Sequence, residues 1–126
     1  MGDCKMNNRF KFRIYSFLDK SFHYFSIGDG ETGYPQGIAG GVSEPQQYTG
    51  LTDKNDKEIY EGDILSTYMN DVDKNQEGVV GRAISGAFVC IYNYIPSDED
   101  RSKLFTHYVL NVAHESVIVG HNNKEL

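Results

Sequence analysis

Residues 47–65 read Gln47-Tyr-Thr-Gly-Leu-Thr52, Asp53-Lys-Asn-Asp-Lys57 and Glu58-Ile-Tyr-Glu-Gly-Asp-Ile-Leu65, and they carry the clearest structural signal in the chain. The two outer segments contain the aromatic and β-branched residues that favour strands. The segment between them is rich in Asn and Asp, whose side chains tolerate left-handed backbone and cap their own turns. The stretch therefore predicts two strands joined by a polar turn, the second strand running from Glu58 to Leu65.

Towards the N-terminus, Arg9–Tyr15 alternates between apolar and charged residues. Period two is the mark of a half-buried strand, and one face of this strand carries three cations, Arg9, Lys11 and Arg13. Phe22–Ile27 is a second, aromatic strand, and the two strands predict a β-hairpin.

Residues 28–45 contain six glycines and two prolines and show little apolar periodicity. A structureless segment of this length is uncommon in a compact domain. We expect this glycine-rich loop either to cover another part of the protein or to be mobile.

The C-terminal half predicts further short strands around a polar loop at Asn70–Glu77. The expected strands are Gly78–Val80 and Ala87–Tyr94, joined near Ser85-Gly86, followed by Phe105–Val112 and Ser116–Val119. Ser97 followed by acidic residues resembles a helix N-cap, so one short helix is expected at Ser97–Leu104. The fold class is mostly β, a small barrel or sandwich with at most one short helix.

Length and charge restrict the class of protein. A chain of 126 residues is most simply one domain. Residues 1–22 carry five basic and two acidic side chains, whereas the remainder carries seven basic and sixteen acidic ones, and the net charge is −6. Nucleic acid is disfavoured as a partner, because its binding needs clustered Lys and Arg to displace counterions from phosphate.

The cysteines and the hydropathy pattern bear on the compartment. Cys4 and Cys90 are too few to form a disulfide framework, and Cys90 lies in an apolar run, where a free cysteine behaves as a small hydrophobe. No stretch approaches the ~20 apolar residues of a membrane span, and Met1–Asn8 lacks the apolar core of a signal peptide. We expect a cytoplasmic protein with no membrane contact.

The stretch Gln47–Leu65 closely resembles the signature of the YopX family, small proteins of phages and prophages. It departs from the usual sequence of the family motif mainly at Thr52, Asp56 and Leu65, and Asp56 replaces a turn glycine. Lys11-Phe-Arg13 resembles the opening strand of the family, and Val117–Leu126 resembles its closing segment, although the match weakens around His121–Lys124.

The resemblance implies a fold, a setting and an assembly. It implies a small SH3-type barrel over residues 47–126, preceded by an N-terminal β segment and glycine-rich loop over residues 1–46. It further implies a phage- or prophage-encoded protein in the bacterial host cytoplasm that self-associates into a homo-oligomer. It supplies no catalytic residue.

Several residue groups have a composition or spacing that could suit a metal, phosphate or catalytic site. His107, His114 and His121 recur every seven residues, but in a strand this odd spacing alternates faces, and surface or loop positions explain them better. Asp71, Asp73, Asn75 and Glu77 alternate as calcium ligands do, but they lack the glycine and the length of a calcium loop. The glycine runs lack the Gly-Lys-Ser/Thr ending of a phosphate-binding loop. We expect no catalytic residue, no metal and no cofactor.

Three non-enzymatic functions remain open, and an enzyme ranks after them. The first is a phage accessory protein that binds a host protein. The second is a counter-defence protein that binds a small nucleotide signal, for which Tyr or Phe should lie beside Arg9, Arg13, Lys54 or Arg82. The third is nucleic-acid binding through the basic strand face. The candidate surface for a ligand or partner comprises Arg9, Lys11, Arg13, Tyr48, Tyr60 and Arg82.

Overall fold

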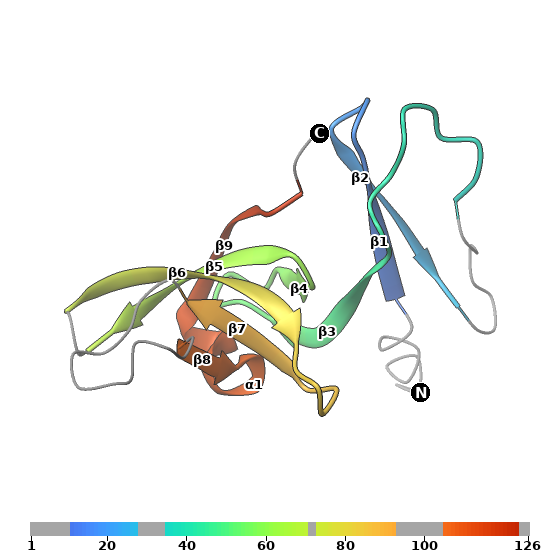
Figure 1. Cartoon of the computed structure of the whole chain (residues 1–126). Helices are drawn as coiled ribbons and strands as arrows, with labels where there is room; N and C mark the ends of the chain where they lie inside the picture. Colours follow the sequence, from blue (N-terminus) through green and yellow to red (C-terminus); the bar gives the residue numbers. More distant parts are fainter. Residues whose placement is uncertain (1–10, 28–34, 71–72, 93–104, 124–126) are drawn as a thin grey trace.

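The computed structural model describes residues 11–27, 35–70, 73–92 and 105–123. Two antiparallel sheets make up this part of the chain, one with strand order β2-β1-β3-β4 and one with order β8-β7-β6-β5-β9. Figure 1 shows the sheets side by side, with the β1–β2 hairpin at one end of the molecule and the longer sheet curving into a half-barrel at the other. The mostly β fold class is confirmed. The half-barrel is open, with β8 and β9 as its two edges, and the SH3 type is not confirmed.

The first sheet contains the predicted hairpin. β1 (Lys11–Ser16) pairs along its whole length with β2 (Ser21–Ser26), and Phe12 and Arg13 pair on the other side with β3 (Gln46–Thr52). β3 then pairs with β4 (Glu58–Tyr60) across the polar turn that the sequence predicts. The Asx-type turn forms even though the family glycine is Asp56 here, because Asp56 adopts a left-handed φ of 70°.

The predicted strand Glu58–Leu65 is wrong as a single element. It is divided at Gly62 into β4 and β5 (Asp63–Met69), and the two halves belong to different sheets. Gly62 has a φ of 88°, which a strand does not accommodate and a glycine adopts without steric cost. Because the chain changes sheets at this residue, the connection between the sheets lies inside the segment with the strongest signal.

The half-barrel is built from four further strands. They are β6 (Lys74–Arg82), β7 (Phe88–Tyr92), β8 (Phe105–Tyr108) and β9 (Ser116–His121). The predicted polar loop Asn70–Glu77 is too long, because β6 begins at Lys74 and pairs with the end of β5. Exposed polar side chains are compatible with a strand here because the ladder already pairs the backbone groups.

The short helix lies in a different place from the prediction. The predicted strand Phe105–Val112 ends at Tyr108, and Val109–Val112 forms α1, followed by a 3-10 turn, η2 (Ala113–Glu115). Val109 and Val112 are buried, so the helical turn places both on the core side. The helix expected at Ser97–Leu104 lies outside the described residues.

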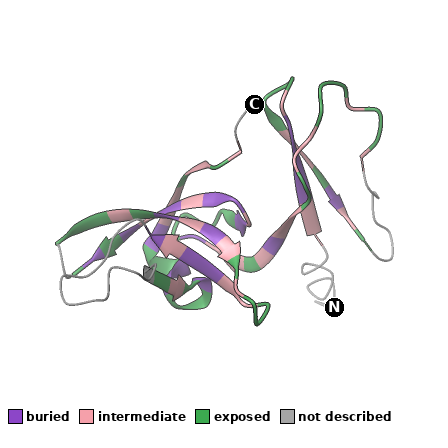
Figure 2. Cartoon of the chain, viewed as in Figure 1, coloured by how far each residue is buried: buried purple, intermediate pink, exposed green. Residues whose placement is uncertain are grey.

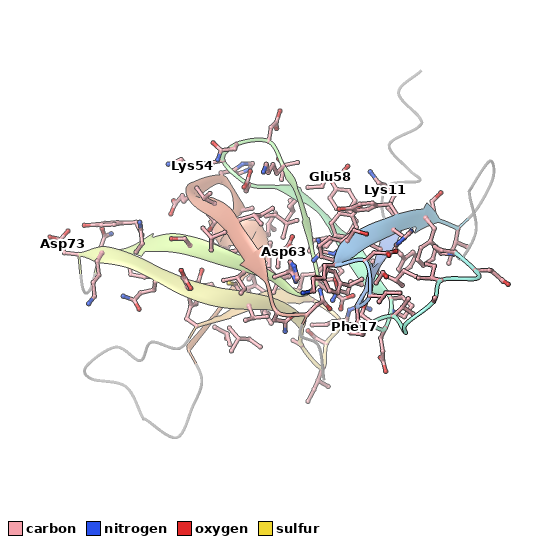
Figure 3. All side chains as sticks on the ribbon, turned by 90° about the horizontal axis from the view of Figure 1, so that it is seen from above. Lys11, Phe17, Lys54, Glu58, Asp63 and Asp73 are labelled. Atoms are coloured by element: carbon pink, nitrogen blue, oxygen red, sulfur yellow. The ribbon has the colours of Figure 1, made fainter. Side chains whose placement is uncertain are left out.

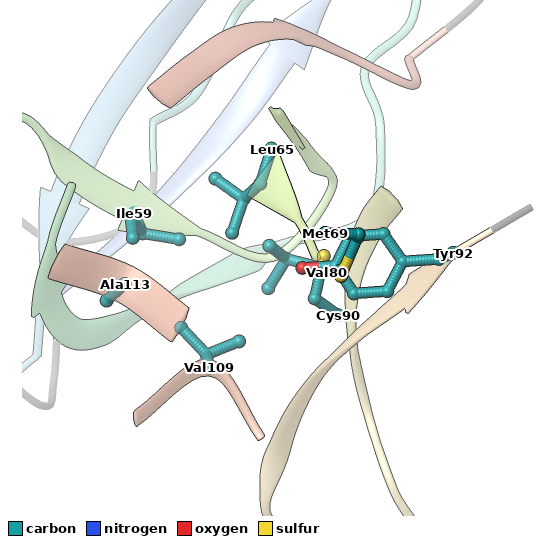
Figure 4. Close-up of a cluster of buried hydrophobic side chains, with 8 residues drawn as sticks. All are labelled: Ile59, Leu65, Met69, Val80, Cys90, Tyr92, Val109 and Ala113. Carbon is teal, nitrogen blue, oxygen red and sulfur yellow. The ribbon is translucent and has the colours of Figure 1, made fainter. Parts of the chain in front are cut away.

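The core lies inside the half-barrel, with α1 covering its open side. Figure 4 shows its buried side chains, which come from β4 to β7, α1 and η2: Ile59, Leu65, Met69, Val80, Cys90, Tyr92, Val109 and Ala113. Figure 2 shows buried positions alternating mainly with partly buried ones along β5 and the second half of β6. In the described residues, no helix is long and apolar enough to cross a membrane.

The described part of the glycine-rich loop covers one side of β1. The N–H of Ser43 donates to the carbonyl of Tyr15, the N–H of Tyr15 donates to the Ser43 hydroxyl, and Val42 forms a bridge with Ser16. Three glycines in this segment, Gly37, Gly40 and Gly41, have positive φ. The loop therefore pairs where β3 no longer reaches β1.

Candidate functional site

A cavity of about 560 Å³ lies where the two sheets meet. β1, β2 and β4 supply one side and β5 and β9 the other, with one residue from the polar turn. We name it the inter-sheet cavity, and it is lined by Lys11, Arg13, Phe22, Tyr24, Lys57, Glu58, Tyr60, Asp63, Ile118, Gly120 and His121. Figure 3 shows Lys11, Glu58 and Asp63 in this region between the blue strands and the half-barrel.

Arg13 is the central cation of the cavity, and its burial corrects the sequence interpretation. The alternation places it on a solvent-facing basic surface, but only 4% of it is exposed. Its Nε donates to Gln46 Oε1 at 2.8 Å, and its Nη2 donates to Glu61 O at 3.1 Å and to Asp63 Oδ1 at 2.8 Å. The Arg13 face of β1 is buried, not exposed to solvent, because the connection through Gly62 brings the second sheet over it.

Aromatic rings hold the Arg13 guanidinium on its flat faces. Its central carbon lies 3.9 Å from the centre of the Phe22 ring and 4.9 Å from that of Tyr60. Such contacts stabilise a cation more strongly when water is excluded. The hydrogen bonds and rings together hold the side chain in a single position.

Asp63 is the buried partner of Arg13 and accepts a second hydrogen bond. Its Oδ2 accepts the backbone N–H of Tyr60 at 2.8 Å, across the turn at Gly62. Burial raises the pKa of Asp63, while Arg13, the Tyr60 N–H and His121 act against that rise. The Arg13–Asp63 ion pair joins β1 of one sheet to β5 of the other.

A second ion pair lies at the rim of the cavity. Lys11 Nζ lies 2.5 Å from Glu58 Oε2 and 5.1 Å from the centre of the Tyr48 ring. The Tyr60 hydroxyl donates to Glu58 Oε1 at 3.2 Å. Burial, with the Glu58 charge next, raises the pKa of both Tyr48 and Tyr60, so both remain neutral phenols at physiological pH.

The structure brings only part of the predicted surface together. Lys11, Arg13 and Tyr60 line the inter-sheet cavity, and the Tyr48 ring packs behind them, 5.4 Å from the Tyr60 ring. Arg82 does not line it: its Nη2 lies 2.5 Å from Gln47 Oε1 and 3.4 Å from Glu61 Oε1, and its guanidinium lies over the Phe88 ring. Arg9 lies outside the described residues.

A nucleotide site is expected to place an aromatic ring beside a cation, and such a pair occurs at Arg13 and at Arg82. Arg13 lies beside Phe22 and Tyr60, and Arg82 lies beside Phe88. The basic strand face required for nucleic acid is not formed in the described residues, because Arg13 is buried and Lys11 is paired with Glu58.

Sequence reasoning missed the cavity residues of β2 and β9. The ring centre of His121 lies 4.7 Å from that of Tyr15 and 5.0 Å from that of Phe22, so this histidine packs between the two sheets. Tyr24 is 55% exposed, and its ring centre lies 5.5 Å from that of Tyr60. The aromatic pattern of β2 was visible in the sequence, but which strand would face it was not.

The remaining candidates from the sequence are the possible metal ligands, the calcium-like alternation and Cys90. Within the described residues, no group of three His, Cys, Asp or Glu side chains could hold a metal ion. Asn75 and Glu77 of the calcium-like alternation lie in β6 and pair with Tyr68 and Ser66 of β5, and Asp71 lies outside the described residues. Cys90 is fully buried, and burial raises the pKa of its thiol to about 11, which keeps it in the unreactive thiol form.

Comparison with known proteins identifies the family. The family model described as YopX protein matches residues 9–119, which covers both sheets and every lining residue of the cavity except Gly120 and His121. No curated protein matches the chain. Because the family model spans most of the sequence, this chain belongs to the YopX family.

Proposed function

We propose that the protein is a non-catalytic binding protein that holds a small nucleotide-like molecule in the inter-sheet cavity. The observation that carries the proposal is the cavity itself, about 560 Å³ between two sheets, with aromatic rings beside cations. Its size is within the ~300–1,000 Å³ of ordinary small-molecule sites, which combine apolar walls with a few fixed polar groups. Arg13, held by three hydrogen-bond acceptors and two aromatic rings, is such a fixed group.

The pairing of the ionisable groups supports binding over catalysis. Asp63 is engaged by Arg13 and by the Tyr60 N–H, and Glu58 is engaged by Lys11 and by the Tyr60 hydroxyl. A general base needs a lone pair within reach of the substrate and a pKa matched to the working pH. These carboxylates hold neighbouring groups in place, which is the requirement of a rigid binding site.

The proposed setting is a phage or prophage protein in the bacterial cytoplasm that sequesters a host immune signal. A protein that removes a signal by binding needs a site, not a reaction. Self-association and a host protein partner are part of the same proposal. The feature that favours them is the β8–α1 corner, where Tyr108 is 56% and Leu110 is 68% exposed.

The test compares ligand retention in the wild type and in two tyrosine variants. Native mass spectrometry of gently purified protein, after incubation with lysate of phage-infected bacteria, should show an added mass of a few hundred daltons. Tyr24→Ala, at the cavity, should abolish this added mass. Tyr68→Ala is the matched control, because this tyrosine of β5 is also exposed, at 47%, but lies outside the cavity.

The same native mass spectra also give the number of subunits in the assembly. Equal adducts in both variants would place the ligand elsewhere, and no adduct together with no thermal shift from a small-molecule library would contradict the proposal. A monomer at all concentrations would remove self-association from it.

A further inference from the structure

The guanidinium of Arg13 keeps unused hydrogen-bond donors beside the inter-sheet cavity. Three of its five N–H groups are used, by Gln46, Glu61 and Asp63. Within the described residues, the two N–H groups of Nη1 have no acceptor, and Nη1 is not sealed from solvent. Arg13 is 4% exposed and borders the cavity. A buried, immobile arginine with a free amine edge is suited to a ligand oxygen.

Among the charged residues that line the cavity, one cation, Lys57, has no ion pair within the described part of the chain. Glu58 is paired with Lys11 and Asp63 with Arg13. The charge of Asp53, in the same turn, attracts Lys57, but Asp53 does not line the cavity and its oxygens accept backbone N–H groups. The site therefore matches a ligand with a single negative charge.

The aromatic wall supplies a surface for a flat ring. Tyr24 is more than half exposed and stands edge-on to Tyr60, with an angle of 66° between the ring planes. Tyr60 is 2% exposed and holds its hydroxyl on Glu58, so it supports Tyr24 from behind. Exposed tyrosine faces of this kind stack on nucleobases with little sequence preference.

We infer that the ligand of the inter-sheet cavity is a nucleoside phosphodiester with one negative charge, of the cyclic mononucleotide class. The inference rests on the proposed function and names its ligand. The base stacks on Tyr24, a non-bridging phosphate oxygen accepts from Arg13 Nη1, and the phosphate charge is balanced by Lys57. Arginine suits this task because its planar fork of donors matches the oxygens of a phosphate.

Isothermal titration with small probes of graded charge tests the ligand class on the unmodified protein. Cyclic AMP and cyclic GMP should bind. Adenosine and guanosine, which lack the phosphate, should bind at least about tenfold more weakly, since a hydrogen bond to a charged group contributes at least that factor. AMP, with a second charge, should bind more weakly than cyclic AMP, and inorganic phosphate should show no binding.

Two matched pairs of variants test the residues. Lys57→Gln should weaken cyclic nucleotide binding at least about threefold and flatten its salt dependence, whereas Lys54→Gln, in the same exposed turn, should leave both unchanged. Tyr24→Ala should weaken binding by about five- to a hundredfold, and Tyr68→Ala, an exposed tyrosine outside the cavity, should not. All four positions are on the surface or at the cavity rim, so folding is preserved.

The outcomes separate this inference from the proposed function. Equal affinity for adenosine and cyclic AMP, tighter binding of AMP, or equal effects of Lys57→Gln and Lys54→Gln would each overturn the phosphodiester class. If no probe binds but native spectra retain another adduct that Tyr24→Ala removes, the proposed function stands and the inference fails. If no adduct is retained either, both fail.

Discussion

At the scale of single residues, Asp53 connects the family turn to the rest of the molecule. Its Oδ1 accepts the backbone N–H groups of Asn55 and Lys57 at 2.8 and 3.0 Å, which closes the turn between β3 and β4. Its Oδ2 accepts the N–H of Ile118 at 3.0 Å, which ties the turn to β9 of the other sheet. One carboxylate therefore contributes both local and long-range structure.

Asp53 should make stability depend on acid pH. Burial alone would raise the pKa of Asp53, but the hydrogen bonds from the backbone N–H groups of Ile118, Lys57 and Asn55 together lower it below its ordinary value. A carboxyl with a lowered folded pKa stabilises the protein above its unfolded pKa of about 3.9 and loses that contribution as pH falls through the folded value.

The measurement is urea unfolding of the wild type and of Asp53→Asn between pH 2 and pH 7. Asp53→Asn should lower the free energy of unfolding at pH 7 by about 2–3 kcal/mol, because an amide oxygen replaces a charged acceptor and one of the three donors loses its partner. The difference between the two proteins should shrink below pH 4. A constant difference across this range would show that the carboxylate charge does not contribute.

At the scale of elements, Gly62 sets the path of the chain between the sheets. Its N–H donates to Val80 O at 2.9 Å, and its carbonyl accepts the N–H of Asn122 at 2.8 Å. A Cβ at this position would lie 2.7 Å from Gln46 Nε2 and 3.0 Å from Asn122 Oδ1. The residue thus combines a left-handed backbone with close packing at the junction of β4 and β5.

Gly62→Ala should be clearly more destabilising than Gly50→Ala. Both glycines have nearly the same φ, 88° and 87°, so both variants carry the cost of a left-handed L-residue, about 1–2 kcal/mol. No atom lies within 4 Å of the Cβ position at Gly50, whereas Gly62→Ala must displace the Gln46 amide, which is hydrogen-bonded to Arg13 and Asn123. We expect Gly62→Ala to lower the free energy of unfolding by at least about 1 kcal/mol more than Gly50→Ala.

Thermal and urea unfolding of the two variants measure this difference. Equal losses of stability would mean that the Gln46 and Asn122 side chains move aside without cost, and that the backbone conformation alone requires glycine at residue 62.

At the scale of the whole molecule, the Arg13–Asp63 ion pair is a buried polar link between the sheets. The nitrogen and oxygen are 2.8 Å apart, and the side chains are 5% and 4% exposed. Breaking a buried pair by removing one partner typically costs about 3–5 kcal/mol, because the other charge is left uncompensated. Cavity shape, sheet packing and stability therefore depend on the same two residues.

A double-mutant cycle with Arg13→Met and Asp63→Asn measures the link. Each single variant should lower the free energy of unfolding by about 3 kcal/mol. The double variant should lose less than the sum of the two, by at least about 1 kcal/mol, because neither charge is then left unpaired. Strict additivity would show that Arg13 is held by its other partners, Gln46, Glu61 and the Phe22 ring.

The sequence by itself determined the local structure: the hairpin of β1 and β2, the Asx turn after β3, the turn at Ser85-Gly86 and the mostly β class. Periodicity and turn chemistry act over a few residues, so they can be read without knowing what lies opposite. The family could also be read from Gln47–Leu65, since its motif is contiguous.

Only the tertiary structure decided the site. Because Glu58–Leu65 is divided at Gly62, β5 enters the other sheet. This path places Asp63 and His121 against one face of β1. The alternation of apolar and charged residues alone assigns that face to solvent. The placement of α1 at Val109–Val112 likewise depends on the core that it covers. Contacts between residues some fifty positions apart, such as Arg13 with Asp63, leave no periodic signal in the sequence, because their energy arises only when the two sheets exclude water between them.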